Sequence, residues 1–317
     1  MKLVTVCITT FNRVNLILKT VESILEQTYT NFEIIIVDDC SSDGTDVFVE
    51  ESILTLDKRI KYIKHTENKG LATARNTAIN NAKGEYFTFC DDDDTWDDNF
   101  ISLFIEQAQK YDNTYSFCVS NIANDNSVKV IHSSFKNFIL LGYTPPVASQ
   151  FYRTKTLKDI GGYDESITSG VDHDLWLTLG FKNYNLVWLN QSAVRVNKNE
   201  NINRMTLNID KRVNGIKRSM NIWKERIGNN FGNEFFTCFE KNYEYNTYKK
   251  FIILALKKKF FLNVWSYWYK LPKSLLLKDV IRYLKSKFKS SEVLIHATFG
   301  KCNKNSDITL NDITIIR

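Results

Sequence analysis

The sequence predicts an α/β protein in which helices flank a mostly parallel sheet, with a helical extension at the C-terminal end. Three observations predict this class. Short β-branched runs alternate with segments of helical periodicity through the first 98 residues. Acidic residues follow directly after two of these runs, and beyond residue 200 the composition becomes rich in lysine and aromatic residues. The 317 residues, 43% hydrophobic and 25% charged, suffice for a large core, which excludes the disordered and fibrous classes.

The alternation opens with a β-α-β unit. We expect strands at Leu3 to Thr9 and Phe32 to Val37, because both are apolar, β-branched runs of strand length that end in polar residues. Apolar residues recur at helical spacing between them, from Val14 to Gln27. A second helix is expected after Ser42-Asp43-Gly44-Thr45. The pattern continues with a strand at Ile60 to Lys64, a helix at Ala72 to Ala82 and a strand at Tyr86 to Cys90.

Beyond about residue 98 the alternation weakens, and the pattern predicts a mixed α+β region. It includes a helix at Phe100 to Tyr111 and a strand at Tyr115 to Asn121. We therefore expect residues 1–200 to form one domain with two halves, 1–98 and 99–200, and residues 201–317 to form a separate helical region. Helical spacing in that region covers residues 207–227, 234–259 and 275–289.

The net charge of +6 hides an asymmetry between the two parts of the chain. Residues 1–197 carry 18 Lys and Arg against 26 Asp and Glu, a net charge of −8, whereas residues 198–317 carry 24 against 10, a net charge of +14. A basic region of this kind suits nucleic acid or an anionic membrane surface. Lys257-Lys258-Lys259 and the aromatic group Trp265, Tyr267, Trp268 and Tyr269 resemble an interfacial membrane-binding surface. The alternative is an ordinary helical extension with solvated lysines and core aromatics.

The location of the protein is predicted from three features. The segment Met1 to Cys7 has too short an apolar run for a signal peptide. The longest apolar runs, such as Phe251 to Leu256, fall far short of the roughly 20 residues that span a bilayer. Six scattered cysteines without a C-x-x-C pair indicate neither disulfides nor a thiolate zinc site. We expect a cytoplasmic protein.

Four consecutive aspartates, Asp91 to Asp94, stand where the strand ending at Cys90 gives way to a loop. In a parallel sheet, ligands gather beyond the carboxyl ends of the strands. Four neighbouring carboxylates repel one another, and a hard cation such as Mg²⁺ or Mn²⁺ relieves that repulsion. The alternative is a solvated acidic loop, but the preceding strand and the following Trp96 favour a site.

This segment and four others resemble the motifs of the inverting GT-A glycosyltransferases of glycosyltransferase family 2. Each string alone is a modest signal, and five in the right order make coincidence improbable. They are Val6 to Arg13 (V-C-I-T-T-F-N-R), Val37 to Thr45 (V-D-D-C-S-S-D-G-T), Asn68 to Asn76 (N-K-G-L-A-T-A-R-N), Phe89 to Trp96 (F-C-D-D-D-D-T-W) and Gly161 to Glu165 (G-G-Y-D-E) followed by Asp172 to Trp176 (D-H-D-L-W). The resemblance implies a GT-A fold with a Rossmann-like sheet, a nucleotide-binding half at 1–98 and an acceptor half at 99–200.

The resemblance also implies which residues bind the nucleotide. Asp39 would accept a hydrogen bond from the uracil N–H, and Arg75 would contact the uridine or the diphosphate. The alternative for Arg75 is a structural role at a helix start, and for Asp43 the capping of a turn is the better reading. The remaining pocket residues implied by the family are Thr9, Asn12, Arg13, Asp91 and Asp92.

For the metal, Mn²⁺ or Mg²⁺, the resemblance makes Asp93 the direct ligand, with Asp91 bonded to the ribose or to a metal-bound water. The metal would neutralise the leaving diphosphate as a Lewis acid. The family often adds a histidine ligand in a Y-R-x-H-like string, and here the comparable stretch ends in Asn197. Either the asparagine carbonyl or water would then complete the coordination.

The catalytic base implied by the resemblance is Asp172, which would remove the proton of the acceptor hydroxyl as that oxygen attacks the anomeric carbon. Val171 replaces the glutamate that precedes the base in the family pattern. Asp174 is the alternative base. Helical positions two residues apart face different directions, so only one of the two aspartates should point into the cleft.

The resemblance implies a UDP-sugar-dependent hexosyltransferase. It would move a hexose or N-acetylhexosamine to a hydroxyl of a glycan acceptor, linked to polyprenyl diphosphate, in the synthesis of O-antigen (lipopolysaccharide), capsule or a related polysaccharide. The enzyme would act at the inner face of the cell membrane as a peripheral protein, without a nucleic-acid partner. One alternative, a nucleic-acid-binding protein that uses the basic helices, leaves the aspartates unexplained. Another, a sugar nucleotidyltransferase, normally has a glycine-rich phosphate loop, and Thr9 to Asn15 contains no glycine.

Overall fold

The computed structural model describes residues 1–110, 117–120, 130–134, 146–182, 184–189, 193–195, 209–237, 239–240, 243 and 314–316. The chain divides into two compact units. The first comprises residues 1–135, 144–205 and 313–317, and the second comprises residues 136–143 and 206–312. Asn197, the tail aromatics at 265–269 and the helix expected at 275–289 lie outside the described residues.

The described residues of the first unit form a nine-stranded sheet, in the order β11-β7-β9-β6-β8-β4-β1-β2-β3. The half built from the first four strands is parallel: β1 pairs with β2 and β4, and β2 pairs with β3. These strands are Val4–Thr10 (β1), Phe32–Asp38 (β2), Ile60–Lys64 (β3) and Tyr86–Asp91 (β4). β2 is buried along its whole length and β1 nearly so, as expected of parallel strands covered on both faces. The predicted mostly parallel sheet is confirmed.

The other half of the sheet is mixed. Strand β8 runs antiparallel to β4 and β6, whereas β9 runs parallel to β6. Strands β7 and β11 close this side as antiparallel neighbours. The bounds are Phe117–Ser120 (β6), Val130–Ser134 (β7), Gln150–Arg153 (β8), Asn185–Leu189 (β9) and Thr314–Ile316 (β11). A separate two-stranded sheet joins Thr95–Trp96 (β5) to Val194–Arg195 (β10).

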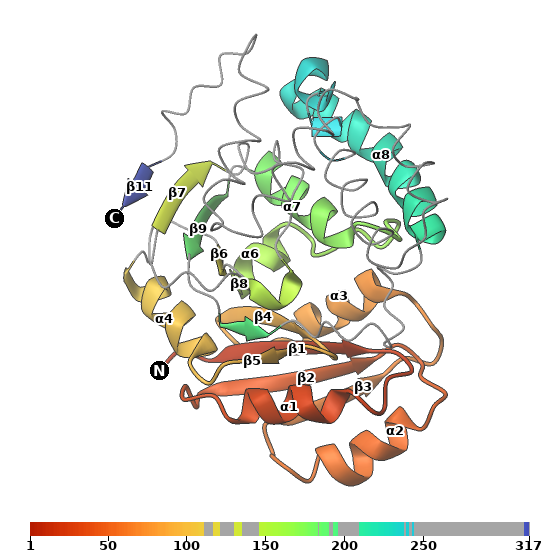
Figure 1. Cartoon of the computed structure of the whole chain (residues 1–317), viewed down its shortest axis with the longest axis vertical. Coiled ribbons are helices and arrows are strands. Elements are labelled where there is room, and N and C mark those ends of the chain that lie inside the picture. Colours follow the sequence, from red (N-terminus) through yellow and green to blue (C-terminus); the bar gives the residue numbers. More distant parts are fainter. Residues whose placement is uncertain are drawn as a thin grey trace, which may run out of the picture. The chain divides into compact units, whose positions relative to one another are not determined.

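Helices cover both faces of the parallel half. In Figure 1, α1 and α2 lie on one side of β1 to β3 and α3 lies on the other. Right-handed crossovers require this arrangement, because the order β3-β2-β1-β4 reverses direction after β3. The helices of this unit are Ile17–Leu25 (α1), Thr45–Phe48 (α2, continued by a π turn at Val49–Ile53), Leu71–Asn81 (α3), Phe100–Lys110 (α4), a 3₁₀ turn at Val147–Ser149, Thr154–Asp159 (α6) and Val171–Phe181 (α7).

The first helix begins later than the sequence predicts, at Ile17 instead of Val14. The reason is local. The Val14 N–H donates to the Asp43 carboxylate (3.1 Å), and the Asn12 N–H donates to the Ser41 hydroxyl (2.8 Å). These bonds hold the chain after β1 against the loop after β2, and a turn closed by the Leu16 N–H and the Arg13 carbonyl (3.0 Å) precedes the helix. Val14 to Leu16 therefore belong to the loop and not to the helix.

Stacked aromatic rings pack next to the segment that follows β4. Trp96 stacks on Phe100 with ring centroids 3.9 Å apart, and Phe104 stacks on Phe151 at 5.1 Å. The Trp96 indole N–H donates to the Ala148 carbonyl (3.0 Å). Trp96 is therefore a buried core residue that fixes the chain directly after Asp91 to Asp94.

The second unit contains the helix α8 (Ile209–Phe231), longer than the predicted 207–227 segment at its C-terminal end. Its buried Trp223 meets the rings of Phe239 and Tyr243 edge to face, with centroids 6.0 and 5.3 Å apart. Aromatic residues of this unit thus form a small core. Within the described residues, no helix has the length and apolarity needed to cross a bilayer.

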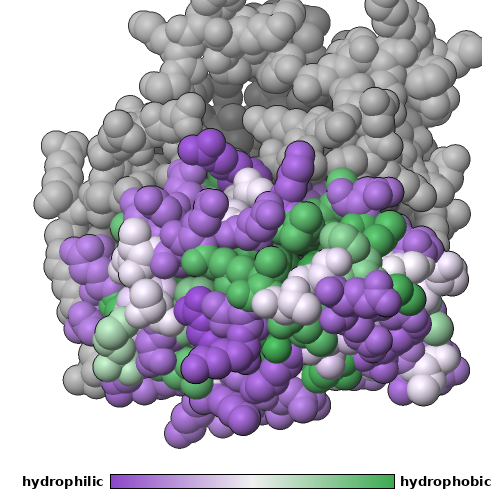
Figure 2. Space-filling view, turned by 90° about the horizontal axis from the view of Figure 1, so that it is seen from below, coloured by the Kyte–Doolittle hydropathy of each residue, from purple (hydrophilic) through white to green (hydrophobic). Residues whose placement is uncertain are grey.

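Hydrophilic side chains dominate the face shown in Figure 2, with a hydrophobic strip among them. Large apolar side chains that are exposed are few in the described part of the chain: Met1, Phe11, Val47 and Leu56.

Candidate active site

Three of the motif segments meet where β1, β2 and β4 end. Strand pairing sets Thr9 beside Asp91 and Thr10 beside Asp38. The loops that follow these strands therefore emerge side by side at one edge of the sheet, as carboxyl ends of parallel strands must. Thr9 is half-buried at this edge.

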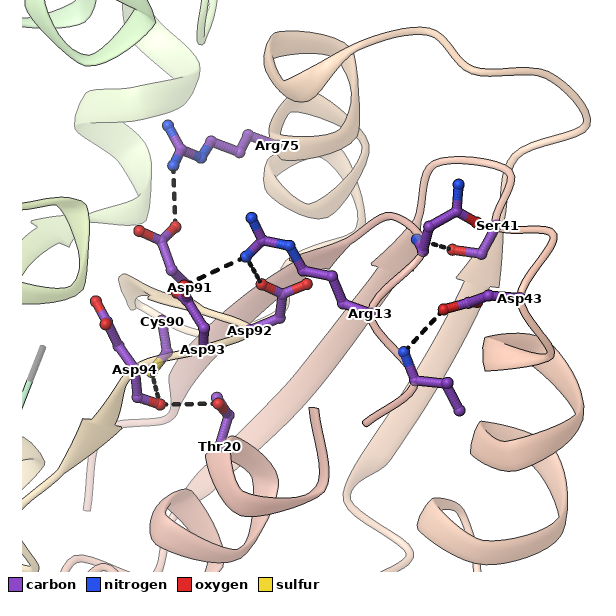
Figure 3. Close-up of polar contacts among 12 residues, drawn as sticks. Arg13, Thr20, Ser41, Asp43, Arg75, Cys90, Asp91, Asp92, Asp93 and Asp94 are labelled. Carbon is purple, nitrogen blue, oxygen red and sulfur yellow. Dashed lines mark hydrogen bonds and ion pairs between the residues drawn. The ribbon is translucent and has the colours of Figure 1, made fainter. Parts of the chain in front are cut away.

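Arg13 reaches from the loop after β1 to the aspartate cluster. Its Nη1 lies 2.7 Å from Asp92 Oδ1 and 3.4 Å from Asp93 Oδ2 (Figure 3). Both carboxylates and the guanidinium are largely shielded from water, which strengthens the attraction between them. Burial alone lowers the pKa of Arg13, and Asp92 and Asp93 more than offset this, so the guanidinium stays charged.

Arg75 connects the cluster to the second half of the unit. Its side chain is 2% exposed; Nη2 lies 3.3 Å from Asp91 Oδ1 and Nη1 lies 2.6 Å from Asp172 Oδ1. The guanidinium also faces the rings of Phe89 and Tyr163 at 5.4 and 5.3 Å. Burial lowers the pKa of Arg75, but Asp172, Tyr163 and Asp91 outweigh it and raise the pKa overall. Arg75 is therefore a permanent buried cation between two aspartates from different elements.

Hydrogen bonds at its start fix the position of helix α3, which carries Arg75. Gly70 precedes the helix with φ of +89°, a conformation that residues with a Cβ rarely adopt. The Gly70 and Lys69 N–H groups donate to the Asp39 carboxylate at 2.7 and 2.8 Å. The start of α3 is thereby tied to the end of β2.

Asp39 itself is 5% exposed and has both oxygens engaged. Its Oδ1 is also 2.8 Å from His65 Nδ1, and His65 Nε2 is 2.9 Å from the Thr77 hydroxyl. The structure thus places Asp39 as the anchor of the loop before α3, a role that the motif resemblance does not suggest. His65 directly follows the carboxyl end of β3, and that position is the sequence signal by which it could have been found.

The four aspartates after β4 do not form one equivalent set. Asp91 has a side chain 40% exposed, whereas the side chains of Asp92 and Asp93 are 5% and 7% exposed beside Arg13. Asp94 is buried, and its backbone carbonyl accepts a hydrogen bond from the Thr20 hydroxyl (2.8 Å, Figure 3). Asp91 is therefore the member most open to a ligand.

Charge is not balanced in this region. Burial raises the pKa of Asp92 to about 7 against the opposing effect of Arg13. Burial, followed by Asp172 and Asp93, raises the pKa of Asp91, against the opposing effect of Arg75. Two arginines, Arg13 and Arg75, pair with the four carboxylates of Asp91, Asp92, Asp93 and Asp172. This leaves an excess of negative charge that a divalent cation would neutralise.

The structure distinguishes the two candidate bases on α7. Asp172 has a side chain 32% exposed and contacts Arg75, while its Oδ2 has no hydrogen-bond partner among the described residues. Asp174 is 2% exposed and lies within the core of this unit. Asp172 is thus the one that faces Asp91 across Arg75.

Two further motif residues have structural contacts. The Asn12 side-chain carbonyl accepts the Ser42 N–H at 2.8 Å, and Asn12 itself has φ of +54°. Asp43 accepts the N–H groups of Thr45 and Val14, both at 3.1 Å, which is the turn-capping role that we favoured. Both residues hold the loops after β1 and β2 together.

No group of three or more His, Cys, Asp or Glu side chains in the described residues is arranged to hold a metal ion by itself. Asp91 and Asp93 nevertheless fit a magnesium-type site, because Mg²⁺ is usually held by one or two carboxylates together with substrate phosphates. The proposed further ligand Asn197 lies outside the described residues.

Comparison with known proteins identifies the family of this chain. The sequence model described as Glycosyl transferase family 2 matches residues 5–170, which is more than half of the chain and includes the aspartate cluster. The chain belongs to glycosyl transferase family 2. The expected resemblance and the GT-A fold are both confirmed.

Relatives within the family are similar over only part of their length. An uncharacterized glycosyltransferase of Rickettsia felis is 36% identical over 57% of this chain, and the match covers 30% of that protein. The UDP-Glc:alpha-D-GlcNAc-diphosphoundecaprenol beta-1,3-glucosyltransferase WfgD of Escherichia coli is 38% identical over 40% of this chain, and the match covers 49% of WfgD. The chain therefore spans half or less of these relatives.

A solved structure supports the fold of the family. TarS 1-349 of S. aureus, determined in complex with UDP-GlcNAc, superposes with a TM-score of 0.62 and covers 80% of this chain and 81% of TarS 1-349. Its sequence is 19% identical, so the likeness concerns the fold alone.

Three residues of this family 2 site were not singled out by sequence reasoning. Asn76 and Tyr163 lie within the quoted A-R-N and G-G-Y strings, so the motifs contained the signal, but nothing local indicates that the two residues meet. Their contact, like that of His65 with Asp39, depends on how the loops pack in three dimensions.

Proposed function

We propose that the protein is an inverting glycosyltransferase that moves a hexose or N-acetylhexosamine from a UDP-sugar to a hydroxyl of a glycan acceptor. The observation that carries the proposal is the bridge of Arg75 between Asp91 and Asp172. One guanidinium links a carboxylate of the motif that would hold the diphosphate to a partly exposed carboxylate on α7. A donor whose diphosphate is bound at Asp91 would therefore have its anomeric carbon near Asp172, where the acceptor hydroxyl would bind.

In this proposal Asp172 is the base and its Oδ2 is the reacting atom. Arg75 engages Oδ1, so the carboxylate is held in one orientation while Oδ2 is open. The acceptor oxygen attacks the anomeric carbon, its proton passes to Oδ2, and the bond from that carbon to the diphosphate oxygen breaks, releasing UDP. A single displacement of this kind inverts the configuration at the anomeric carbon.

Asp91 and Asp93 would hold Mn²⁺ or Mg²⁺ together with the diphosphate. When bound, the metal supplies Lewis-acid stabilisation of the leaving diphosphate. The chain itself supplies Arg13, which keeps Asp92 and Asp93 in place near the site in the absence of any ligand.

The choice of donor and acceptor is supported by similar proteins. The name of WfgD gives a UDP-sugar donor and a diphosphoundecaprenol-linked acceptor, and TarS 1-349 was determined with UDP-GlcNAc. We propose the same classes here, in the synthesis of O-antigen, capsule or a related polysaccharide. The net charge of +14 over residues 198–317 supports docking to the anionic inner face of the cell membrane, where a polyprenyl-linked acceptor is presented.

Two matched variants test the proposed mechanism. Asp172→Asn keeps the shape and removes the basicity, so transfer should fall by about 10²–10⁴-fold, the usual contribution of a positioned base, while UDP binding in Mn²⁺ is retained. Asp174→Asn is the comparison on the same helix and should be milder, because that side chain lies in the core. NMR of the product should show a β-linkage from an α-linked UDP-hexose. An α-linked product refutes the single displacement, and an inactive Asp174 variant beside an active Asp172 variant transfers the role.

A further inference from the structure

Asn76 directly follows Arg75 on α3, and its side chain makes contacts of a different kind. The Asn76 Oδ1 accepts the N–H of Tyr163 at 2.8 Å, and Nδ2 donates to the Tyr163 carbonyl at 2.9 Å. Nδ2 also donates to Glu165 Oε1 at 2.8 Å. The amide thus pairs with both backbone groups of one residue, as a neighbouring strand would, although 87 positions separate the two residues.

Gly162 provides the room for this pairing. It has φ of +73°, and a Cβ at this position would lie 2.4 Å from Asn76 Oδ1. Real Cβ atoms do not approach an oxygen so closely, so any side chain at 162 displaces the amide. The second glycine of the G-G-Y string is therefore needed for the close approach of Asn76 and for its own backbone conformation.

Tyr163 carries the effect onward to the base. It is 3% exposed, its ring faces the Arg75 guanidinium at 5.3 Å, and its edge-on contact with Phe89 is 5.7 Å between centroids. Its hydroxyl lies 3.5 Å from Asp172 Oδ1, the same oxygen that Arg75 engages. Tyr163 is thus held by its backbone, by its ring and by its hydroxyl. The hydroxyl is the part that contacts the carboxylate of Asp172.

We propose that Asn76 is a positioning residue for Asp172, acting through the backbone and side chain of Tyr163. The inference rests on the proposed function, in which Asp172 is the base. Arg75 and Asn76 are adjacent on one helix, so α3 controls Asp172 twice: directly by charge, and indirectly through Tyr163. Loss of the amide would let Tyr163 and the oxygen beside it shift, and a displacement of about 1 Å at a reacting group can cost about 10²-fold in rate.

The kinetic test compares Asn76→Ala with Asn81→Ala. Asn81 lies on the same helix, and within the described part of the chain its amide donates only to the Thr77 carbonyl one turn back, so its variant is the matched control. Asn76→Ala should lower kcat by about 10–100-fold and leave UDP binding within about twofold of wild type, a change of under ~0.4 kcal/mol. Asn81→Ala should change neither. Gly162→Ala should reproduce the kcat loss.

A double variant separates positioning of the base from general weakening. In an Asp172→Asn background, Asn76→Ala should cost little further activity, because the group it positions no longer acts as a base. The same fold loss in both backgrounds would overturn the inference while leaving Asp172 as the base. Full activity of Asp172→Asn alone would instead remove the proposed function, on which the inference rests.

Hydrogen exchange supplies a readout that needs no activity. The amide hydrogen of Tyr163 should exchange faster in Asn76→Ala than in wild type, whereas Asn81→Ala should leave its exchange unchanged. If the Tyr163 amide hydrogen is equally protected from exchange in folded Asn76→Ala, Asn76 does not position Tyr163, whatever the kinetics show.

Discussion

Removing the carboxylate of Asp39 tests the anchor that ties β2 to the start of α3. The structure shows three donors on this carboxylate: Lys69 N–H, Gly70 N–H and the His65 ring, at 2.8, 2.7 and 2.8 Å. We expect Asp39→Ala to destabilise the protein and to weaken UDP binding, since the loop it releases leads into the helix that carries Arg75.

The expected loss of stability follows from these contacts. Hydrogen bonds to a charged group contribute about 1.5–3 kcal/mol each, so the three together contribute at most about 4.5–9 kcal/mol. Lys69 is exposed and Gly70 half-buried, so water can replace part of the loss at these two N–H groups. We therefore expect a destabilisation of about 3–5 kcal/mol, which lowers Tm by roughly 6–20 °C in a domain of this size.

Thermal unfolding followed by circular dichroism measures the first effect, and calorimetric titration with UDP and with inorganic diphosphate measures the second. Asp46→Ala is the control, because Asp46 pairs with Lys64 at the surface. A loop anchor predicts equal losses of affinity for UDP and for diphosphate. A Tm like that of wild type, with a loss of affinity confined to UDP, would falsify the anchor and support Asp39 as a direct reader of the uracil base.

Three further predictions concern the cluster and the tail. Asp93→Ala should abolish transfer and weaken UDP binding in Mn²⁺ while the protein stays folded; undiminished turnover contradicts its role as a metal ligand. In metal-free protein, Asp92 should make stability fall as pH rises from about 4 to about 7, because its folded pKa is raised to about 7 from an ordinary value of 3.8 and ionisation of the buried form is unfavourable. Melting curves in EDTA at pH 5.5 and 8 should therefore differ less for Asp92→Asn than for wild type, and an equal difference refutes the assignment. Residues 198–317 should bring the protein to anionic liposomes at low salt, with binding that fades through physiological ionic strength; failure to pellet with such liposomes marks the tail as a structural extension.

Much of the first half of the fold could be predicted because its signals are local. The strand at Ile60 to Lys64 has the predicted bounds. The strands β2 and β4 differ from prediction by one residue at one end, and β1 and α3 by one residue at both ends. Parallel strands buried on both faces must be continuously apolar, and a surface helix such as α1 between them is amphipathic, so the sequence alone displays the pattern. The late start of α1 was missed because its cause, the pairing of Val14 with Asp43, is a contact between two loops.

For the site, the sequence determined which residues stand at the carboxyl ends of the strands and which family they belong to. Only the tertiary structure decided which of them meet. Arg75 and Asp172 are 97 positions apart, and the choice of Asp172 over Asp174 as the open carboxylate depends on how α7 is rotated against the sheet. Asp39 has the same motif position whether it reads a base or holds a loop, and its bonds to Lys69 and Gly70 follow from the course of the chain after β3. Periodicity records which face of an element is buried, whereas the pairing of two polar side chains depends on distances that are set only when the elements pack.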